Sequence, residues 1–213
     1  MFEQVASHQI QFSLLDRRPR KEQLAWCASS GCKLLPYGVL AGGLLSDKYV
    51  GKAASDVVVD TASKAKYSSV LRRAGGWEWL QRLLAVLRSI GDEKRRVLLP
   101  CFPAGPKPWM LAHALQMLQT PRLRWVAPPP FLRSAAGRPP VSVANVASRW
   151  ALQQPAVGAL ILGARNAEHV DDHRALFGFE LGDADLGRIE EVLSQGVQPQ
   201  GDTYDWERGS GPF

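Results

Sequence analysis

Residues 141–173, VSVANVASRWALQQPAVGALILGARNAEHVDDH, predict a helix, a strand and a second helix in direct succession. Residues 141–154 have helical spacing, and Ser142 is the predicted N-cap. The apolar run at 157–163 predicts a short buried strand, and a helix is expected at 167–177. Buried strands that alternate with helices are typical of parallel sheets.

The same alternation continues through the rest of the chain. The predicted elements are a strand at 9–15, a helix at 21–30 ended by Gly31, a strand that opens 33–43, an irregular stretch with a short helix at 46–76, an amphipathic helix at 77–90 and a helix at 183–194 capped by Asp183. This order predicts an α/β fold with a parallel sheet. Three parallel strands do not close a barrel, so they leave hydrophobic edges unless other strands pair with them.

Charge and proline divide the chain into two compositional parts. Residues 91–140 hold eight basic and two acidic side chains, which is the whole of the net charge of +6, and ten of the fifteen prolines. The rest of the chain is electrically balanced. We therefore predict one globular unit formed by residues 1–96 and 141–213, and a basic, proline-rich, poorly ordered insert at 97–140.

Several classes of protein are disfavoured by the sequence. No apolar run is long enough for a transmembrane helix, and the first residues do not have the pattern of a secretory signal. Three cysteines without metal-like spacing favour a reducing compartment. His169 and His173 have the spacing of two ligands on one helix, but no third ligand is evident, so no metal site is predicted. We expect an intracellular protein, most simply cytoplasmic, with an organelle left open because the N-terminus could be truncated.

Two glycine-containing loops follow predicted strands, and each allows two interpretations. Neither G-x-G-x-x-G nor a P-loop is present. Glycines in LPYGVLAGG (35–43) allow the backbone to approach a pyrophosphate, or simply form a tight turn. In LGARN (162–166), Arg165 beside a helix N-terminus suits a phosphate or carboxylate. The alternative is that Asn166 caps the helix and Arg165 is solvated.

Four stretches in this order resemble the C-terminal half of the aldo-keto reductases. They are QIQFSLLDRRP, LLPYGVLAGGLLSDKY, the stretch quoted first above, and GDTYDWER, which together cover about 1–90 and 141–208. The family consists of NADP(H)-dependent (β/α)₈ barrels that reduce carbonyl groups. The resemblance therefore implies an incomplete TIM barrel, roughly strands 6–8 with their helices, and phosphate sites after the last two strands.

The resemblance also implies a role for each of twelve residues toward NADP(H). Gln9 matches a glutamine that contacts the nicotinamide carboxamide, and Phe12 a tyrosine that stacks on the nicotinamide ring. The predicted pyrophosphate loop is Tyr37, Gly38, Leu40, Gly42 and Leu44. The predicted adenosine and 2′-phosphate loop is Gly163, Arg165, Asn166 and His169, with Asp172 where the family usually has glutamate.

The family's catalytic Asp, Tyr, Lys and His lie on strands that this sequence does not contain. The resemblance therefore implies an NADP(H)-dependent oxidoreductase at family level that is inactive as this chain alone, with no catalytic residue of its own. The alternatives are a non-catalytic interaction subunit, which self-associates or pairs with a full-length relative, and a truncated product without independent function. Nucleic-acid binding through the insert ranks last, and no membrane partner is expected.

Overall fold

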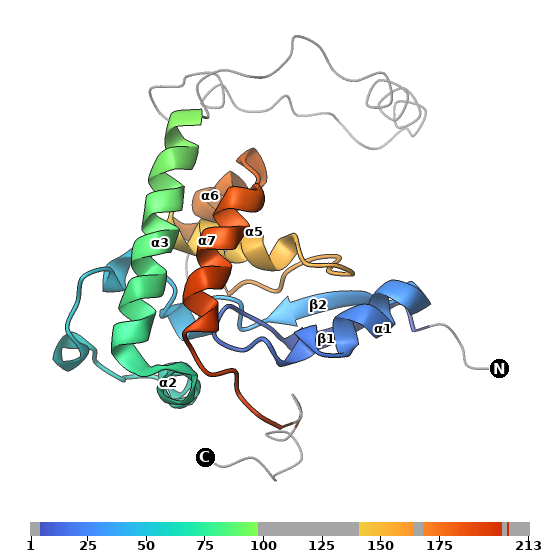
Figure 1. The fold of residues 1–213 in the computed structure, drawn as a ribbon, viewed down its shortest axis with the longest axis horizontal. Helices are drawn as coiled ribbons and strands as arrows, with labels where there is room; N and C mark the ends of the chain where they lie inside the picture. Colours follow the sequence, from blue (N-terminus) through green and yellow to red (C-terminus); the bar gives the residue numbers. More distant parts are fainter. Residues whose placement is uncertain (1–4, 98–140, 164–167, 202–203, 205–213) are drawn as a thin grey trace.

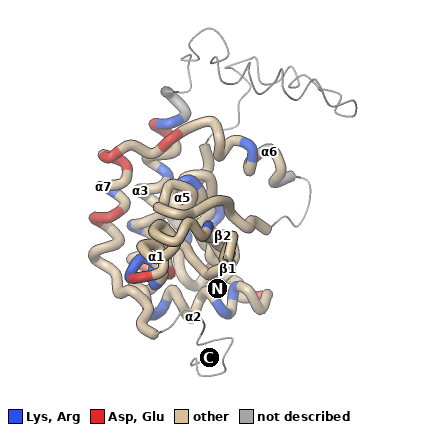
Figure 2. The backbone as a smooth tube through the Cα atoms, turned by 90° about the vertical axis from the view of Figure 1, so that its right-hand side faces the viewer, with Lys and Arg blue, Asp and Glu red and all other residues tan. Residues whose placement is uncertain are grey.

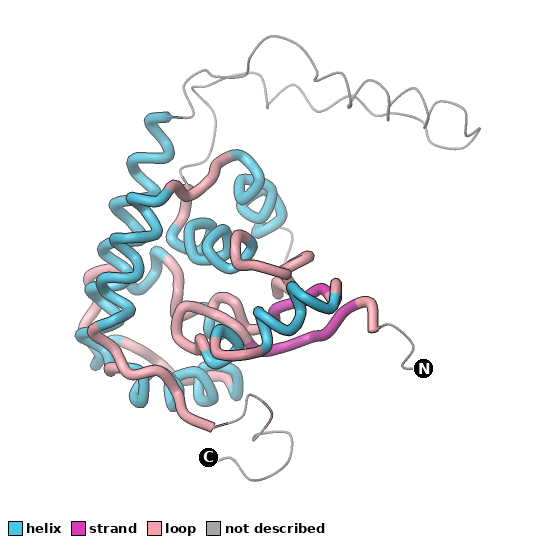
Figure 3. The backbone as a smooth tube through the Cα atoms, turned by 45° about the vertical axis from the view of Figure 1, so that its right-hand side comes forward, coloured by secondary structure: helices cyan, strands magenta, loops and turns pink. Residues whose placement is uncertain are grey.

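The two strands of the sheet are parallel, and α1 connects them as in a βαβ unit. The computed structural model describes residues 5–97, 141–163, 168–201 and 204 (Figure 1). Strand β1 (Ser7–Gln11) pairs with β2 (Lys33–Tyr37), and Gln9 lies opposite Leu35. Figure 3 shows this strand pair at one side of the molecule and the longest helix at the other.

The predicted third strand at 157–163 is wrong as a regular element, although the segment does lie along β2. Val157 forms a single parallel bridge with Leu34. The amides of Gly158 and Ile161 then donate to the carbonyls of Leu34 and Pro36, at 2.9 and 2.8 Å. The donors are three residues apart and the acceptors two, so one extra residue interrupts the ladder in the manner of a bulge.

The described part of the chain contains six α-helices in addition to short 3₁₀ helices. They are α1 (Gln23–Ser30), α2 (Ala62–Ala74), α3 (Gly76–Val97), α5 (Val143–Leu152), α6 (Glu168–Ala175) and α7 (Asp183–Ser194). Gly31 ends α1 in the left-handed conformation, with φ of 77°, as predicted. The Ser142 hydroxyl accepts from the amide of Asn145, so the predicted N-cap of α5 is also confirmed.

Three details of the predicted helices were wrong. The N-cap of α7 is Gly182, and Asp183 is the first residue of the helix. The amide of Gly182 donates to the Asp185 carboxylate at 2.9 Å, so the acidic side chain that satisfies this helix end lies one turn further along. Helix α3 extends seven residues beyond the predicted end at 90, and α2 is longer than the short helix expected within 46–76.

The core lies between the strand pair and the helices. Ile10 and Leu34 are fully buried on the sheet face that the helices cover. Trp79 and Trp150 are 1% exposed, whereas Trp77 is only partly buried. Trp79 also donates its indole N–H to the carbonyl of Val192 at 2.9 Å, which joins α3 to α7.

A fully buried carboxylate organises the turn after β1. Asp16 accepts from the amide of the Gln11 side chain at 2.7 Å and from two guanidinium nitrogens of Arg18 at 2.7 and 2.9 Å. Arg17, next to it, donates to the carbonyls of Leu14 and Leu193 at 2.9 and 3.1 Å. Burial lowers the pKa of Arg17 from its usual value. These contacts connect β1, the following turn and α7.

Charged side chains also join the C-terminal part of α3 to α7. Arg188 of α7 makes a bidentate pair with Glu93 of α3, both at 2.8 Å, and Lys94 pairs with Asp185. Figure 2 marks acidic positions along α7 in red. The predicted insert at 97–140 lies outside the described residues except for Val97. Its poor order therefore stays a prediction.

The side chain of Arg88 on α3 contacts three parts of the chain: the turn at Asp47, the next turn of α3, and the segment that leads into α5. Its guanidinium contacts Asp47 at 2.5 Å, Asp92 at 2.9 Å and the carbonyl of Val141 at 2.8 Å. The second carboxylate oxygen of Asp47 accepts from the amide of Val143 at 2.9 Å. The start of α5 is thereby fixed against α3.

Replacing Arg88 with methionine is expected to lower the free energy of unfolding by about 2 kcal/mol, because three charge-assisted hydrogen bonds are lost. The matched control is Arg82→Met, the same change at an exposed position on the same helix. Arg82→Met is expected to stay within about 0.5 kcal/mol of the parent. Urea unfolding followed by tryptophan fluorescence measures both, and equal effects would contradict the role given to Arg88.

Candidate functional site

The carboxyl ends of β1, β2 and the segment at 157–161 lie at one edge of the sheet, because all three run parallel. Ligands of parallel α/β sheets bind at this edge. Of the predicted site residues, Gln9 is exposed on β1, and Tyr37 and Gly38 are half-buried at the end of β2. Gly163 is exposed where the third segment ends. The structure thus brings the strand that carries Gln9 and the two predicted loops to a common edge.

Phe12 does not lie where a nicotinamide ring could stack on it. Its side chain is fully buried, and its ring packs against Trp150 of α5 at 5.4 Å between centroids. Successive side chains of a strand point to opposite faces, so Phe12 follows Ile10 toward the helices while Gln9 faces the other way. The stacking role predicted for Phe12 is therefore wrong for this structure.

Tyr67 of α2 fills the space beside the glycine-rich loop. Gly38 and Gly42 both have positive φ, at 66° and 65°. A Cβ at Gly38 would meet the Tyr67 hydroxyl at 2.0 Å, and one at Gly42 would meet the Tyr67 ring at 2.9 Å. Packing against α2 therefore explains why these two positions are glycine. Leu40 is half-buried and Leu44 is 1% exposed, so both contribute to the core.

One glycine of the same loop is open. Gly43 has φ of 90°, and nothing lies within 4 Å of the position that its Cβ would take. A left-handed glycine with free space beside it lets a ligand approach the backbone. Gly43 was named in the loop pattern but not among the predicted cofactor residues, because the sequence does not show which glycine faces a neighbouring helix.

Lys66 is a charged group near this loop that the sequence analysis missed. Its ammonium nitrogen lies 5.9 Å from the ring centre of Tyr37 and 5.6 Å from that of Tyr67. It was missed because the residues around it were expected to be largely irregular, whereas they form α2.

Burial is the main reason that the pKa of the Tyr67 hydroxyl is raised to about 12, and the Asp16 carboxylate adds to the effect.

The predicted loop that contains Arg165 is only partly described. Arg165 and Asn166 lie outside the described residues, and only the backbone of His169 is described, at the start of α6. Asp172 accepts from the Ser142 hydroxyl at 3.2 Å and from the Asn145 side-chain amide at 2.9 Å. Its carboxylate therefore joins α6 to the N-terminus of α5. Among the described residues, no group of three potential ligands could hold a metal ion.

Gly38→Ala is expected to destabilise the protein more than Gly43→Ala, by about 1–3 kcal/mol. Both changes place an alanine at positive φ, so the strain of the backbone is matched, and only Gly38 meets a side chain. Urea unfolding of the two variants and the parent measures the difference. Equal losses of stability would show that Tyr67 does not crowd the loop.

In the described part of the chain, no helix combines the length and apolar character needed to cross a membrane.

A solved structure of a glycerol dehydrogenase from Gluconobacter oxydans is similar to this chain, with a TM-score of 0.58 and 21% identity over 94% of the chain. This likeness shows an α/β fold of the TIM-barrel type. The sheet formed by the described residues has two strands, which is consistent with part of such a barrel.

Among curated proteins, flagellar radial spoke protein 5 of Chlamydomonas reinhardtii is 38% identical over 88 residues, which are 40% of this chain. The chain spans 46% of the dehydrogenase and 16% of the radial spoke protein. A model of the aldo/keto reductase family matches residues 3–99 and 129–194, which is most of the chain. The chain therefore belongs to the aldo/keto reductase family of oxidoreductases.

Proposed function

We propose that this chain is the cofactor-binding part of an NADP(H)-dependent aldo-keto reductase barrel, with β1, β2 and the segment at 157–161 equivalent to strands 6–8. The observation that carries the proposal is the common edge at which the three parallel segments end. Membership of the family supports the oxidoreductase assignment and the use of NADP(H).

The residues at this edge fit a dinucleotide in three respects. Gln9 presents an exposed amide on the sheet face opposite the core, where it would hydrogen-bond the nicotinamide carboxamide. Gly43 offers an open backbone for the pyrophosphate, with Lys66 in the adjacent helix α2. Arg165, after the exposed Gly163, would pair with the 2′-phosphate, since a guanidinium suits that dianion.

The bound cofactor would supply a hydride for reduction of a carbonyl group. In this proposal the chain itself binds and orients the dinucleotide but does not donate the proton that the carbonyl oxygen needs. The residues for that step belong to strands outside this sequence. Turnover therefore requires those strands, from the same protein or from a partner.

Free, buried thiols at Cys27 and Cys32 support an intracellular location.

NADPH binding tests the proposal through Arg165. Arg165→Ala is expected to weaken NADPH binding about tenfold or more, and to change NADH binding little, because NADH has no 2′-phosphate. Arg82→Ala, an exposed arginine of α3, is the matched control and is expected to change neither affinity. Fluorescence titration measures each dissociation constant. Absence of saturable NADPH binding, or equal binding by Arg165→Ala and the parent, contradicts the proposal.

A second candidate function, an interaction subunit, is favoured by the edge of β1 that faces away from β2, where no other strand of the described residues pairs with it. The hydrogen bonds from Lys33 to Ala6 and from Phe12 to Tyr37 fix the phase of β1, so the backbone groups of Gln9 face away from β2. At this edge, the Tyr204 hydroxyl contacts His8 and donates to the Gln9 carbonyl at 3.0 Å. Strand edges that lack a neighbouring strand pair readily with other chains.

Light scattering coupled to size-exclusion chromatography tests this second function. If the edge of β1 mediates self-association, Trp26→Glu is expected to convert a concentration-dependent dimer to a monomer, because Trp26 is 57% exposed on the neighbouring helix α1. The control is Phe177→Glu, which changes another exposed aromatic near α6. A parent chain that stays monomeric at high concentration, or an equal effect of both variants, contradicts self-association through this edge.

A further inference from the structure

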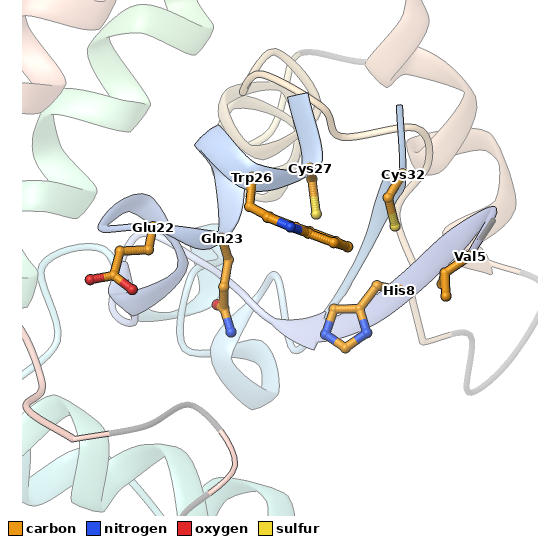
Figure 4. Close-up of a pocket in the computed structure, with 7 residues that line it drawn as sticks. All are labelled: Val5, His8, Glu22, Gln23, Trp26, Cys27 and Cys32. Atoms are coloured by element: carbon orange, nitrogen blue, oxygen red, sulfur yellow. The ribbon is translucent and has the colours of Figure 1, made fainter. Parts of the chain in front are cut away.

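A pocket opens between α1 and β1, outside the edge proposed for the cofactor. Its volume is about 520 Å³, and Trp26, Cys27 and Cys32 lie along its wall with His8 of β1 below them (Figure 4). Each cysteine side chain is only 2% exposed, yet both border this open space. A small molecule that enters the pocket therefore meets two thiols.

The turn after α1 brings the two thiols together. Gly31 adopts the left-handed conformation directly after the helix. Such a turn commonly places the residue after the glycine against the residue four positions before the glycine, here Cys32 against Cys27. The Ser30 hydroxyl lies within 3.4 Å of both the Cys27 carbonyl and the Cys32 amide. The backbone between the cysteines is thus fixed.

The two thiols are neighbours on the wall of the pocket. Burial raises the pKa of Cys27 to about 11, and the neighbouring Cys32 adds to this effect. Cys27 therefore keeps its proton at neutral pH. Buried cysteines often act only as small apolar side chains. What distinguishes this pair is that two sulfurs are adjacent and border the same pocket.

We propose that Cys27 and Cys32 form a dithiol site that a small-molecule disulfide of the glutathione type oxidises to an intramolecular disulfide. The Cys32 sulfur, after loss of its proton, attacks one sulfur of the incoming disulfide. The disulfide bond breaks, and the first small thiol leaves with a proton. Cys27 then loses its proton, its sulfur attacks the Cys32 sulfur, and the second small thiol leaves.

The electrons and atoms of this exchange balance. The protein loses two hydrogen atoms, and one small-molecule disulfide is reduced to two thiols. The product connects the last turn of α1 to the residue before β2, beside the pocket. The site makes no use of NADP(H), so it is independent of the function proposed above.

Mass spectrometry of the folded chain tests the proposal. The parent for this experiment is Cys101→Ser, which removes the cysteine outside the described residues. After incubation with oxidised glutathione at mildly alkaline pH, the expected product has lost two hydrogen atoms and both thiols. Dithiothreitol is expected to restore the original mass. Circular dichroism before and after oxidation shows whether the chain remains folded.

The single replacements Cys27→Ser and Cys32→Ser, each combined with Cys101→Ser, are the controls. Neither can form the internal disulfide, so each is expected to gain at most one glutathione adduct, which dithiothreitol removes. The proposal is overturned if the folded parent keeps both thiols, gains only glutathione adducts, or forms the internal disulfide only after unfolding in urea.

Discussion

The buried carboxylate of Asp16 is the constraint on which the arrangement of the strand edge depends. A charge without contact with water is tolerated only when it is paired and hydrogen-bonded, and Arg18 and Gln11 meet this requirement. Because Gln11 is the last residue of β1, the same contact fixes where the strand ends. Arg17 extends the connection to the end of α7 through Leu193. The turn is therefore held by groups that cannot move singly without leaving a charge or a carbonyl unsatisfied.

Alternation along a strand determines which side chains reach the candidate site. Ile10 and Phe12 point toward the helices, whereas Gln9 points to the opposite face. A motif in the sequence carries no such information unless the phase of the strand is known. For this reason the resemblance could suggest Phe12 as a stacking residue, although its ring is buried against Trp150. Burial, rather than residue type, therefore separates the core residues Ile10 and Phe12 from the exposed Gln9.

Much of the fold could be predicted from local signals. The Ser142 cap, the Gly31 helix end and the two strands follow from short patterns that local physics determines. The broken ladder at 157–161 could not be predicted, because it depends on one extra residue opposite β2. The candidate site was predictable at the level of its loops. The contacts of Tyr67 and Lys66 with those loops depend on how α2 packs, which no spacing in the sequence reveals.

The contact between Arg88 and the Val141 carbonyl also bears on how this fold tolerates change. It holds the chain that follows residue 140 against α3, so the separation of the two points that residues 98–140 connect is set by the globular unit. The closure entropy of a connection between fixed points grows slowly with its length, by about 0.6 kcal/mol for each doubling. A change in the number of residues between the two points is therefore expected to cost little closure entropy while the contact is kept. Substitution of Arg88 itself is expected to cost more, because it releases the start of α5 from α3.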